Sequence, residues 1–237
     1  MGEAGMNNLQ LAAFHDRDEL EQALLIRVIE SLDRGIKERG RATLVVSGGS
    51  TPKALFQRLS YQSLDWSKVT ITLADDRWLP GSHEDSNAKL LGDFLLVNEA
   101  AAARFVPLVD IEQDPDQVLS LNDQLLSSLG RFDVVLLGMG EDGHTASLFP
   151  EADNIAQGLA MDSGKQCLII EPKTAAYTRI TLTLPRLLDC RQLFIHITGH
   201  SKHQLLASLL SKPPQRAQPI SYVLSQERIP VGVYWAE

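Results

Sequence analysis

The feature that most constrains the fold is a set of short apolar runs, each of which ends in a glycine-rich or charged loop. Phe132–Leu137 is the clearest of them and stops at Gly138. A run of this kind is typical of a parallel strand that is buried on both faces. Ala42–Val46 and residues 69–74 follow the same pattern, and segments with helical periodicity lie between the runs. We therefore predict an α/β fold with a mostly parallel, Rossmann-like sheet flanked by helices.

The spacing of apolar residues predicts the remaining elements. Further strands are expected over residues 104–107, 166–170, 179–184, 191–198 and 231–235, and helices over 16–39, 86–97, 116–129 and 201–211. Asp16 is expected to cap the first helix, and Thr51 to cap another that Pro52 opens. The helix over 116–129 should place Val118, Leu121, Leu125 and Leu129 on one face. We predict a single domain over residues 1–237, with 171–186 as a small elaboration.

Charge and cysteine content exclude several classes of function. The chain has 22 Lys and Arg against 30 Asp and Glu, a formal charge of −8. This balance argues against nucleic acid or an anionic membrane as a partner. Cys167 and Cys190 are in no metal-binding pattern, so we expect buried thiols and no metal site. Without a signal peptide or an apolar run of about 20 residues, the chain is expected to be cytoplasmic.

The first candidate site is the loop between Ala42–Val46 and the following helix, with Gly48, Gly49, Ser50 and Thr51 at its centre. Glycines allow backbone N–H groups to approach a ligand, and a helix N-terminus favours an anion. We interpret this loop as a phosphate cradle. The alternative is an ordinary glycine turn before a capped helix. The spacing of a Walker A loop is absent.

The second candidate site follows Phe132–Leu137 and contains Asp142 and His144 among three glycines. A neutral imidazole is suited to general-base work, and a carboxylate can orient it. The sequence does not establish whether the two side chains touch. The glycines also fit G-x-G-x-x-G, but Pro150 ends the segment too early for a dinucleotide-binding helix. The other five histidines are interpreted as structural or solvated.

Three basic residues that follow or open predicted elements could hold an anion: Arg77, Arg179 and Lys202. Arginine binds phosphate or carboxylate with two parallel hydrogen bonds. Asp75 and Asp76 precede Arg77 and could act as a carboxylate pair or tether its side chain. Net charge governs long-range steering, whereas a few local groups bind a phosphate, so the total of −8 does not exclude an anionic substrate.

Taken together, these motifs resemble those of the 6-phosphogluconolactonases, nearly from end to end. The matching segments are 47–52, 75–77 with 86–87, 138–150, 179–181 and 199–202. One departure is Asp76, where that family more often has glutamate. The resemblance implies a fold shared with glucosamine-6-phosphate deaminase and ribose-5-phosphate isomerase.

The resemblance also implies a reaction, the hydrolysis of 6-phosphoglucono-δ-lactone to 6-phosphogluconate in the oxidative pentose phosphate pathway, without cofactor or metal. In that assignment His144 is the general base, with Asp142 and Arg77 in the catalytic group. The residues implied in substrate binding are Gly48, Gly49, Ser50, Thr51, Asp75, Arg179 and Lys202. The partner is then a small phosphorylated sugar lactone, and the chain a monomer or small homo-oligomer.

Three other functions stay open at this point. A glucosamine-6-phosphate deaminase/isomerase shares the Asp142-Gly143-His144 core, but residues 145–150 and Arg77 differ from the pattern of those enzymes. A non-catalytic sugar-phosphate-binding protein would retain the phosphate groups without needing Asp142 and His144. An NAD-binding module rests on the weak glycine pattern alone.

Overall fold

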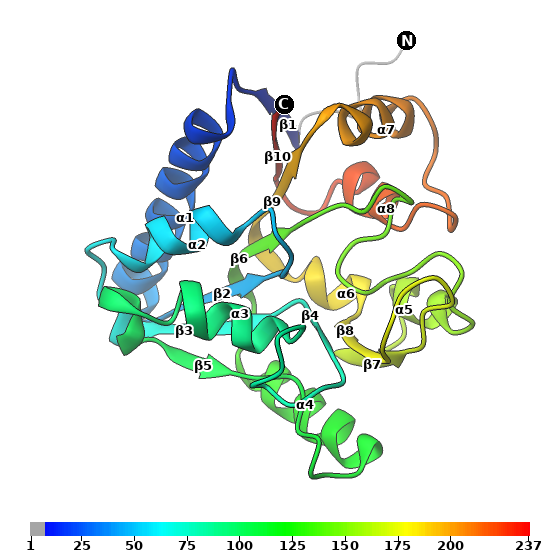
Figure 1. Ribbon diagram of the computed structural model, residues 1–237, viewed down its shortest axis with the longest axis horizontal. Coiled ribbons are helices and arrows are strands. Elements are labelled where there is room, and N and C mark those ends of the chain that lie inside the picture. Colours follow the sequence, from blue (N-terminus) through cyan, green and yellow to red (C-terminus); the bar gives the residue numbers. More distant parts are fainter. Residues whose placement is uncertain (1–7) are drawn as a thin grey trace.

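The computed structural model describes residues 8–237, and its centre is a seven-stranded sheet in which every neighbouring pair is parallel (Figure 1). The strand order is β1-β10-β9-β6-β2-β3-β5. The strands are β1 Leu9–Ala13, β2 Ala42–Val46, β3 Val69–Leu73, β5 Arg104–Val106, β6 Phe132–Leu137, β9 Cys190–Thr198 and β10 Val231–Ala236. This arrangement confirms the α/β prediction.

A smaller antiparallel sheet stands beside the large one, in the order β4-β8-β7. Its strands are β4 Asp75–Arg77, β7 Cys167–Ile170 and β8 Arg179–Leu182. Of the region 171–186, where an elaboration was expected, residues 179–182 belong to this sheet and residues 171–178 connect its strands β7 and β8. The polar segment β4 forms a strand because it pairs with β8, which no pattern of apolar residues could indicate.

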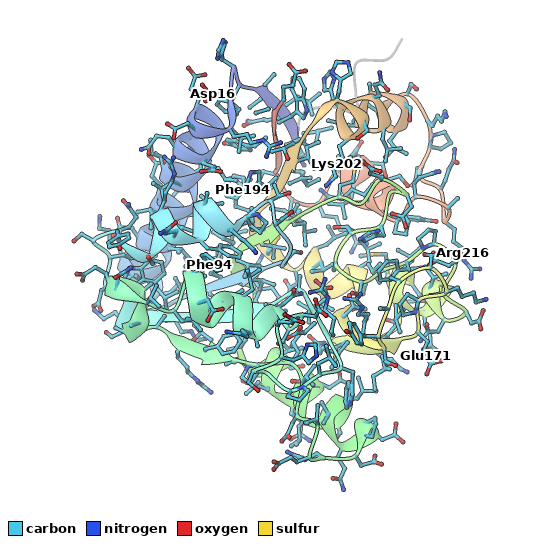
Figure 2. All side chains as sticks on the ribbon, viewed as in Figure 1. Asp16, Phe94, Glu171, Phe194, Lys202 and Arg216 are labelled. Atoms are coloured by element: carbon cyan, nitrogen blue, oxygen red, sulfur yellow. The ribbon has the colours of Figure 1, made fainter. Side chains whose placement is uncertain are left out.

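Helices cover both faces of the large sheet. They are α1 Arg17–Arg39, α2 Lys53–Ser60, α3 Asn87–Phe94, α4 Pro115–Ser128, α5 Ile155–Leu159, α6 Leu184–Leu187, α7 His200–Leu210 and α8 Ile220–Ser225, with short 3₁₀ turns at Trp66–Lys68 and Asn98–Ala102. In Figure 1, α1 and α2 lie on one side of the sheet and α6 and α8 on the other. Figure 2 shows Asp16 at the start of α1, where its side chain accepts a hydrogen bond from the backbone of Glu19, as predicted.

The connections reverse direction between β2 and β6, which are neighbours in the sheet. From β2 the chain continues outward through β3 to β5, and from β6 it continues the opposite way through β9 to β10. The loops that follow β2 and β6 therefore diverge and leave a crevice between them. Open α/β sheets bind their ligands at such a switch point, beyond the carboxyl ends of the strands.

One expected helix cap is wrong, and the buried face of another helix differs from its apolar face. Pro52, not Thr51, is the N-terminal cap of α2, and neither residue's side chain caps the helix. In α4 the buried positions are Val118, Asn122 and Leu126, whereas Leu121 is 52% exposed. The buried stripe includes a polar residue because the Asn122 amide donates to the Leu108 carbonyl. A pattern of apolar residues alone could not locate that stripe.

Cys167 and Cys190 are buried free thiols, as expected. Burial raises the pKa of Cys167 to about 12 and that of Cys190 further still. No helix within residues 8–237 has the length and apolar character required to cross a bilayer. Over the same residues, no group of three or more His, Cys, Asp or Glu side chains is arranged to hold a metal ion.

Candidate active site

A cavity of about 370 Å³ opens at the switch point between β2 and β6. Most of the residues singled out in the sequence line it together: Gly48, Gly49, Ser50, Thr51, Asp75, Arg77, His144, Arg179 and Lys202. They come from loops and strands far apart in the chain, and Lys202, labelled in Figure 2, reaches the cavity from the start of α7. Asp142 supports this wall through His144.

The Asp142 and His144 side chains form a hydrogen-bonded pair. The distance from His144 Nδ1 to Asp142 Oδ1 is 2.5 Å, and the His144 backbone N–H donates to the same oxygen at 3.0 Å. Burial alone would raise the pKa of Asp142, but these hydrogen bonds lower it below its ordinary value. An ionised carboxylate only accepts, so Nδ1 carries the proton and Nε2 is left with a lone pair. His144 is thus oriented as a base.

Gly140 makes this pairing possible, because a Cβ at that position would lie 2.2 Å from the His144 ring. The Gly140 backbone N–H donates to the His144 carbonyl at 2.9 Å and closes the loop. The Thr145 hydroxyl adds a hydrogen bond to the Gly138 carbonyl. On its other side, the His144 ring packs against Phe149, with ring centroids 4.5 Å apart. The loop therefore holds the imidazole in one orientation.

The loop after β2 presents polar groups to the same cavity. Gly49 has φ +102°, a conformation that favours glycine. Within residues 8–237, the side chains of Ser50 and Thr51 make no hydrogen bond. Since Thr51 does not cap α2, its hydroxyl is available to a ligand, as are N–H groups at the helix start.

Arg77 is held by neutral groups rather than by the neighbouring carboxylates. Its Nη1 donates to the Asp85 carbonyl at 2.6 Å and to Asn87 Oδ1 at 3.1 Å. Asp76 instead accepts backbone N–H groups from Arg77, Asn87 and Ala88. The tether to Arg77 that the sequence suggested is therefore made by Asp76 to the Arg77 backbone, and neither carboxylate bonds to its side chain. The guanidinium charge is not neutralised by an ion pair with any described residue.

Asp76 is almost fully buried, and burial raises its pKa despite the backbone donors around it. Its hydrogen bonds hold the segment 86–88 against β4, and its side chain does not line the cavity. Asp75, in contrast, lines the cavity and accepts a hydrogen bond of 2.5 Å from the Ser147 hydroxyl. That bond joins the loop after β6 to the strand that carries Arg77.

Three cationic side chains, Arg77, Arg179 and Lys202, reach this one cavity. Burial, and then the charge of Arg77, lowers the pKa of Arg179, and burial also lowers the pKa of Lys202. The Nε atoms of both arginines are buried without a hydrogen-bond partner among residues 8–237. Unpaired donors with like charges in one cavity are suited to a bound anion.

Sequence reasoning missed several residues of the wall, including Asn87, Ser147 and His196. The segment containing Asn87 was recognised as a motif, but its contacts with Gly48 and Arg77 depend on tertiary packing. His196 was grouped with the structural or solvated histidines. It is buried in β9, and burial, together with the charges of Lys202 and Arg17, lowers its pKa to about 4. Nothing in the local sequence indicates that it borders the cavity.

The model of the family described as glucosamine-6-phosphate isomerases/6-phosphogluconolactonase matches residues 15–233. The chain belongs to this family. It is 43% identical over 225 residues to a 6-phosphogluconolactonase of Mesorhizobium japonicum, covering 94% of each chain, and 40% identical over 224 residues to one of Rhizobium meliloti, covering 94% and 97%.

Solved structures of similar proteins have the same fold as this chain. A 6-phosphogluconolactonase from Shewanella baltica superposes with a TM-score of 0.93 at 38% identity, covering 99% of this chain and all of that one. A monomeric glucosamine-6-phosphate deaminase has a TM-score of 0.80 at 18% identity, covering 96% and 97%, and so shares the fold. The expected kinship of fold with the deaminases is confirmed.

Proposed function

We propose that this chain hydrolyses the ring ester of 6-phosphogluconolactone. The observation that carries the proposal is one cavity in which an imidazole oriented by a carboxylate, His144 with Asp142, faces cationic groups that have no carboxylate partner. The base suits activation of water, and the cationic groups suit a phosphorylated substrate. The names of the similar enzymes agree with this reaction.

In the proposed mechanism the phosphate group occupies the loop around Ser50 and Thr51, where Arg179 and Lys202 bind its charge. This grip places the lactone carbonyl near His144 before the reaction begins, which lowers the entropic part of the barrier. Nε2 of His144 removes a proton from water while the water oxygen bonds to the carbonyl carbon. Asp142 stabilises the imidazolium that results.

The carbonyl oxygen then carries a negative charge, and the Arg77 guanidinium is the donor assigned to it. When the tetrahedral intermediate collapses, the bond from the former carbonyl carbon to the ring oxygen breaks. The ring oxygen takes the proton back from His144 and becomes a hydroxyl, and the new carboxylic acid ionises. Every step uses protein groups and water, and we propose no metal or cofactor.

The test compares lactone hydrolysis with the spontaneous rate, using 6-phosphogluconate dehydrogenase to detect the product. We expect wild type to exceed the spontaneous rate and His144→Ala to lose about 10²- to 10⁴-fold in kcat, the usual contribution of a general base. His15→Ala is the matched control, because that side chain is 87% exposed. Wild-type activity no higher than the spontaneous rate would refute the proposal, and ammonia release from glucosamine-6-phosphate would favour the deaminase.

A further inference from the structure

A second cavity, of about 390 Å³, lies at the amino ends of the strands of the large sheet, and the His144 cavity lies at their carboxyl ends. This second cavity is bounded by α1, by the residues before β6 and β10 and by the first residues of β9, so it borders the amino ends of the strands. We call it the arginine cleft; its charged residues are Arg27, Glu30, Arg34, Glu38, Arg39, Arg131, Asp133 and Arg191. It shares no residue with the cavity that contains His144.

The arginine cleft is positively charged although the chain as a whole is acidic. Five of the fourteen arginines line it against three carboxylates, which leaves two positive charges in excess. A local excess of this sign in a chain of net charge −8 is what an anion-binding site requires.

The ion pairs inside the cleft show where the excess resides. Arg27 pairs with Glu30 at 3.2 Å, and Arg39 pairs with both Glu38 and Asp133. Arg191 Nε lies 3.5 Å from Asp133. Within residues 8–237, no carboxylate oxygen lies within 4 Å of the side-chain nitrogens of Arg34 or Arg131. These two residues, from α1 and from the loop before β6, therefore carry the unpaired charge.

The floor of the cleft is fixed before any ligand arrives. Asp133 is buried and accepts the Thr43 backbone N–H at 2.8 Å as well as its arginine bonds. Gly35 lets α1 approach so closely that a Cβ there would lie 2.9 Å from Asp133 Oδ1. Arg131 is anchored through Nε, which donates to the Cys190 carbonyl at 2.9 Å, so its terminal nitrogens remain for a ligand.

We propose that the arginine cleft binds a small anion that carries adjacent phosphate groups. A guanidinium binds the oxygens of one phosphate in a fork, and two arginines held by separate elements can each engage one group of a pyrophosphate unit. The volume of the cleft, about 390 Å³, suits a small molecule better than an extended acidic peptide. Free pyrophosphate and the polyphosphate arm of a nucleotide share this chemistry.

The test follows backbone amide resonances by NMR at constant ionic strength while pyrophosphate, orthophosphate, ADP or hexaglutamate is added. Signals are resolved by residue, so binding in the His144 cavity is observed separately. We expect saturable shifts at residues 130–132 and 191–192 with pyrophosphate, and weaker binding of orthophosphate. Comparison of ADP with pyrophosphate shows whether a nucleoside adds affinity.

Two charge reversals locate the site. Arg34→Glu should weaken pyrophosphate binding at the cleft about tenfold or more, because it removes a charge-assisted contact. Arg104→Glu, on the exposed edge strand β5, changes the net charge equally and should leave binding unchanged. No saturable shift at the cleft up to about 10 mM would overturn the proposal. The proposal would also be overturned if both variants weakened pyrophosphate binding equally, or if orthophosphate bound as tightly as pyrophosphate. Binding of hexaglutamate without binding of pyrophosphate would overturn it as well.

Discussion

At the scale of single residues, the Asn87 amide connects three parts of the active-site cavity, namely Asp75, Arg77 and the glycine loop. Its amide nitrogen donates to the Asp75 carbonyl at 2.8 Å, and its amide oxygen accepts from Arg77. A Cβ on Gly48 would lie 1.9 Å from that oxygen. One amide therefore sets the direction of a guanidinium and the position of the glycine loop together.

Replacing Asn87 with alanine should lower kcat/KM for the lactone by about 10- to 100-fold, because a hydrogen bond to a charged group contributes about 1.5–3 kcal/mol. The expected cause is loss of the orientation of Arg77. Steady-state kinetics with kcat and KM measured separately provide the check.

Asn122→Ala is the matched control, since it also removes a buried amide hydrogen bond but lies in α4 away from the cavity. It should lower the free energy of unfolding and leave kcat/KM unchanged. A second control uses Gly48→Ala, which should be destabilising alone and add little to Asn87→Ala, because the clashing atoms are then gone. Full additivity of the two unfolding free energies would contradict the proposed contact.

At the scale of elements, two helical glycines meet different surroundings. In α1, a Cβ on Gly35 would lie 2.9 Å from Asp133 Oδ1 and 3.0 Å from Ala42 Cβ. In α3, a Cβ on Gly92 would have no atom within 4 Å. Gly35 allows the helix to pack closely against the sheet, whereas Gly92 contributes only backbone freedom.

We expect Gly92→Ala to raise the free energy of unfolding by about 0.5–1 kcal/mol, because alanine restricts the unfolded chain and favours the helix. Gly35→Ala should lower it by about 1–3 kcal/mol through overpacking. Urea denaturation of both variants beside wild type measures the difference. A rise in the free energy of unfolding for both variants would show that helix propensity, not packing, governs these positions.

Sequence patterns predicted elements well where burial on both faces decides them. β2 and β6 have the bounds expected from their apolar runs, and the loops after them form the cavity. β1 was missed because it lies at the edge of the sheet and pairs only with β10. The short helices α5, α6 and α8 were missed as well, since one or two turns contain too few residues to show a period.

The sequence predicted which loops form the candidate site, but it did not predict the hydrogen bonds between their side chains. Strand ends identified His144, Arg77 and the glycine loop as neighbours, but the hydrogen bond from His144 to Asp142 required the turn that Gly140 permits. The Ser147 bond to Asp75 joins residues 72 positions apart, and no local pattern reports such a distance.

At the scale of the whole molecule, the buried His196 makes stability depend on pH. Burial lowers its folded-state pKa from 6.5 to about 4. Between these values the unfolded chain binds a proton that the folded chain excludes, so stability decreases as the pH falls from 6.5 towards 4. The full effect of this one residue is about 3 kcal/mol.

His196→Gln should therefore make the free energy of unfolding less sensitive to pH across this window. Urea denaturation at several values between pH 4.5 and pH 7 gives the slope for wild type and variant, and the difference between them separates His196 from the carboxylates. His15→Gln is the control for removal of an exposed histidine, because that side chain is 87% exposed. An identical slope for His196→Gln would refute the assignment.

The parallel pairing of β1 with β10 has a practical consequence for handling the protein. Because β10 also runs parallel to β9, and β9 to β6, it ends on the side of the sheet where the His144 cavity lies, and the Gly199 backbone N–H before α7 bonds to the Ala236 carbonyl there. An affinity tag or surface linker attached after Glu237 would emerge on the side of the sheet where that cavity lies. Immobilisation through an engineered thiol on the exposed face of α1, for instance Ile26→Cys, would leave that side of the sheet open.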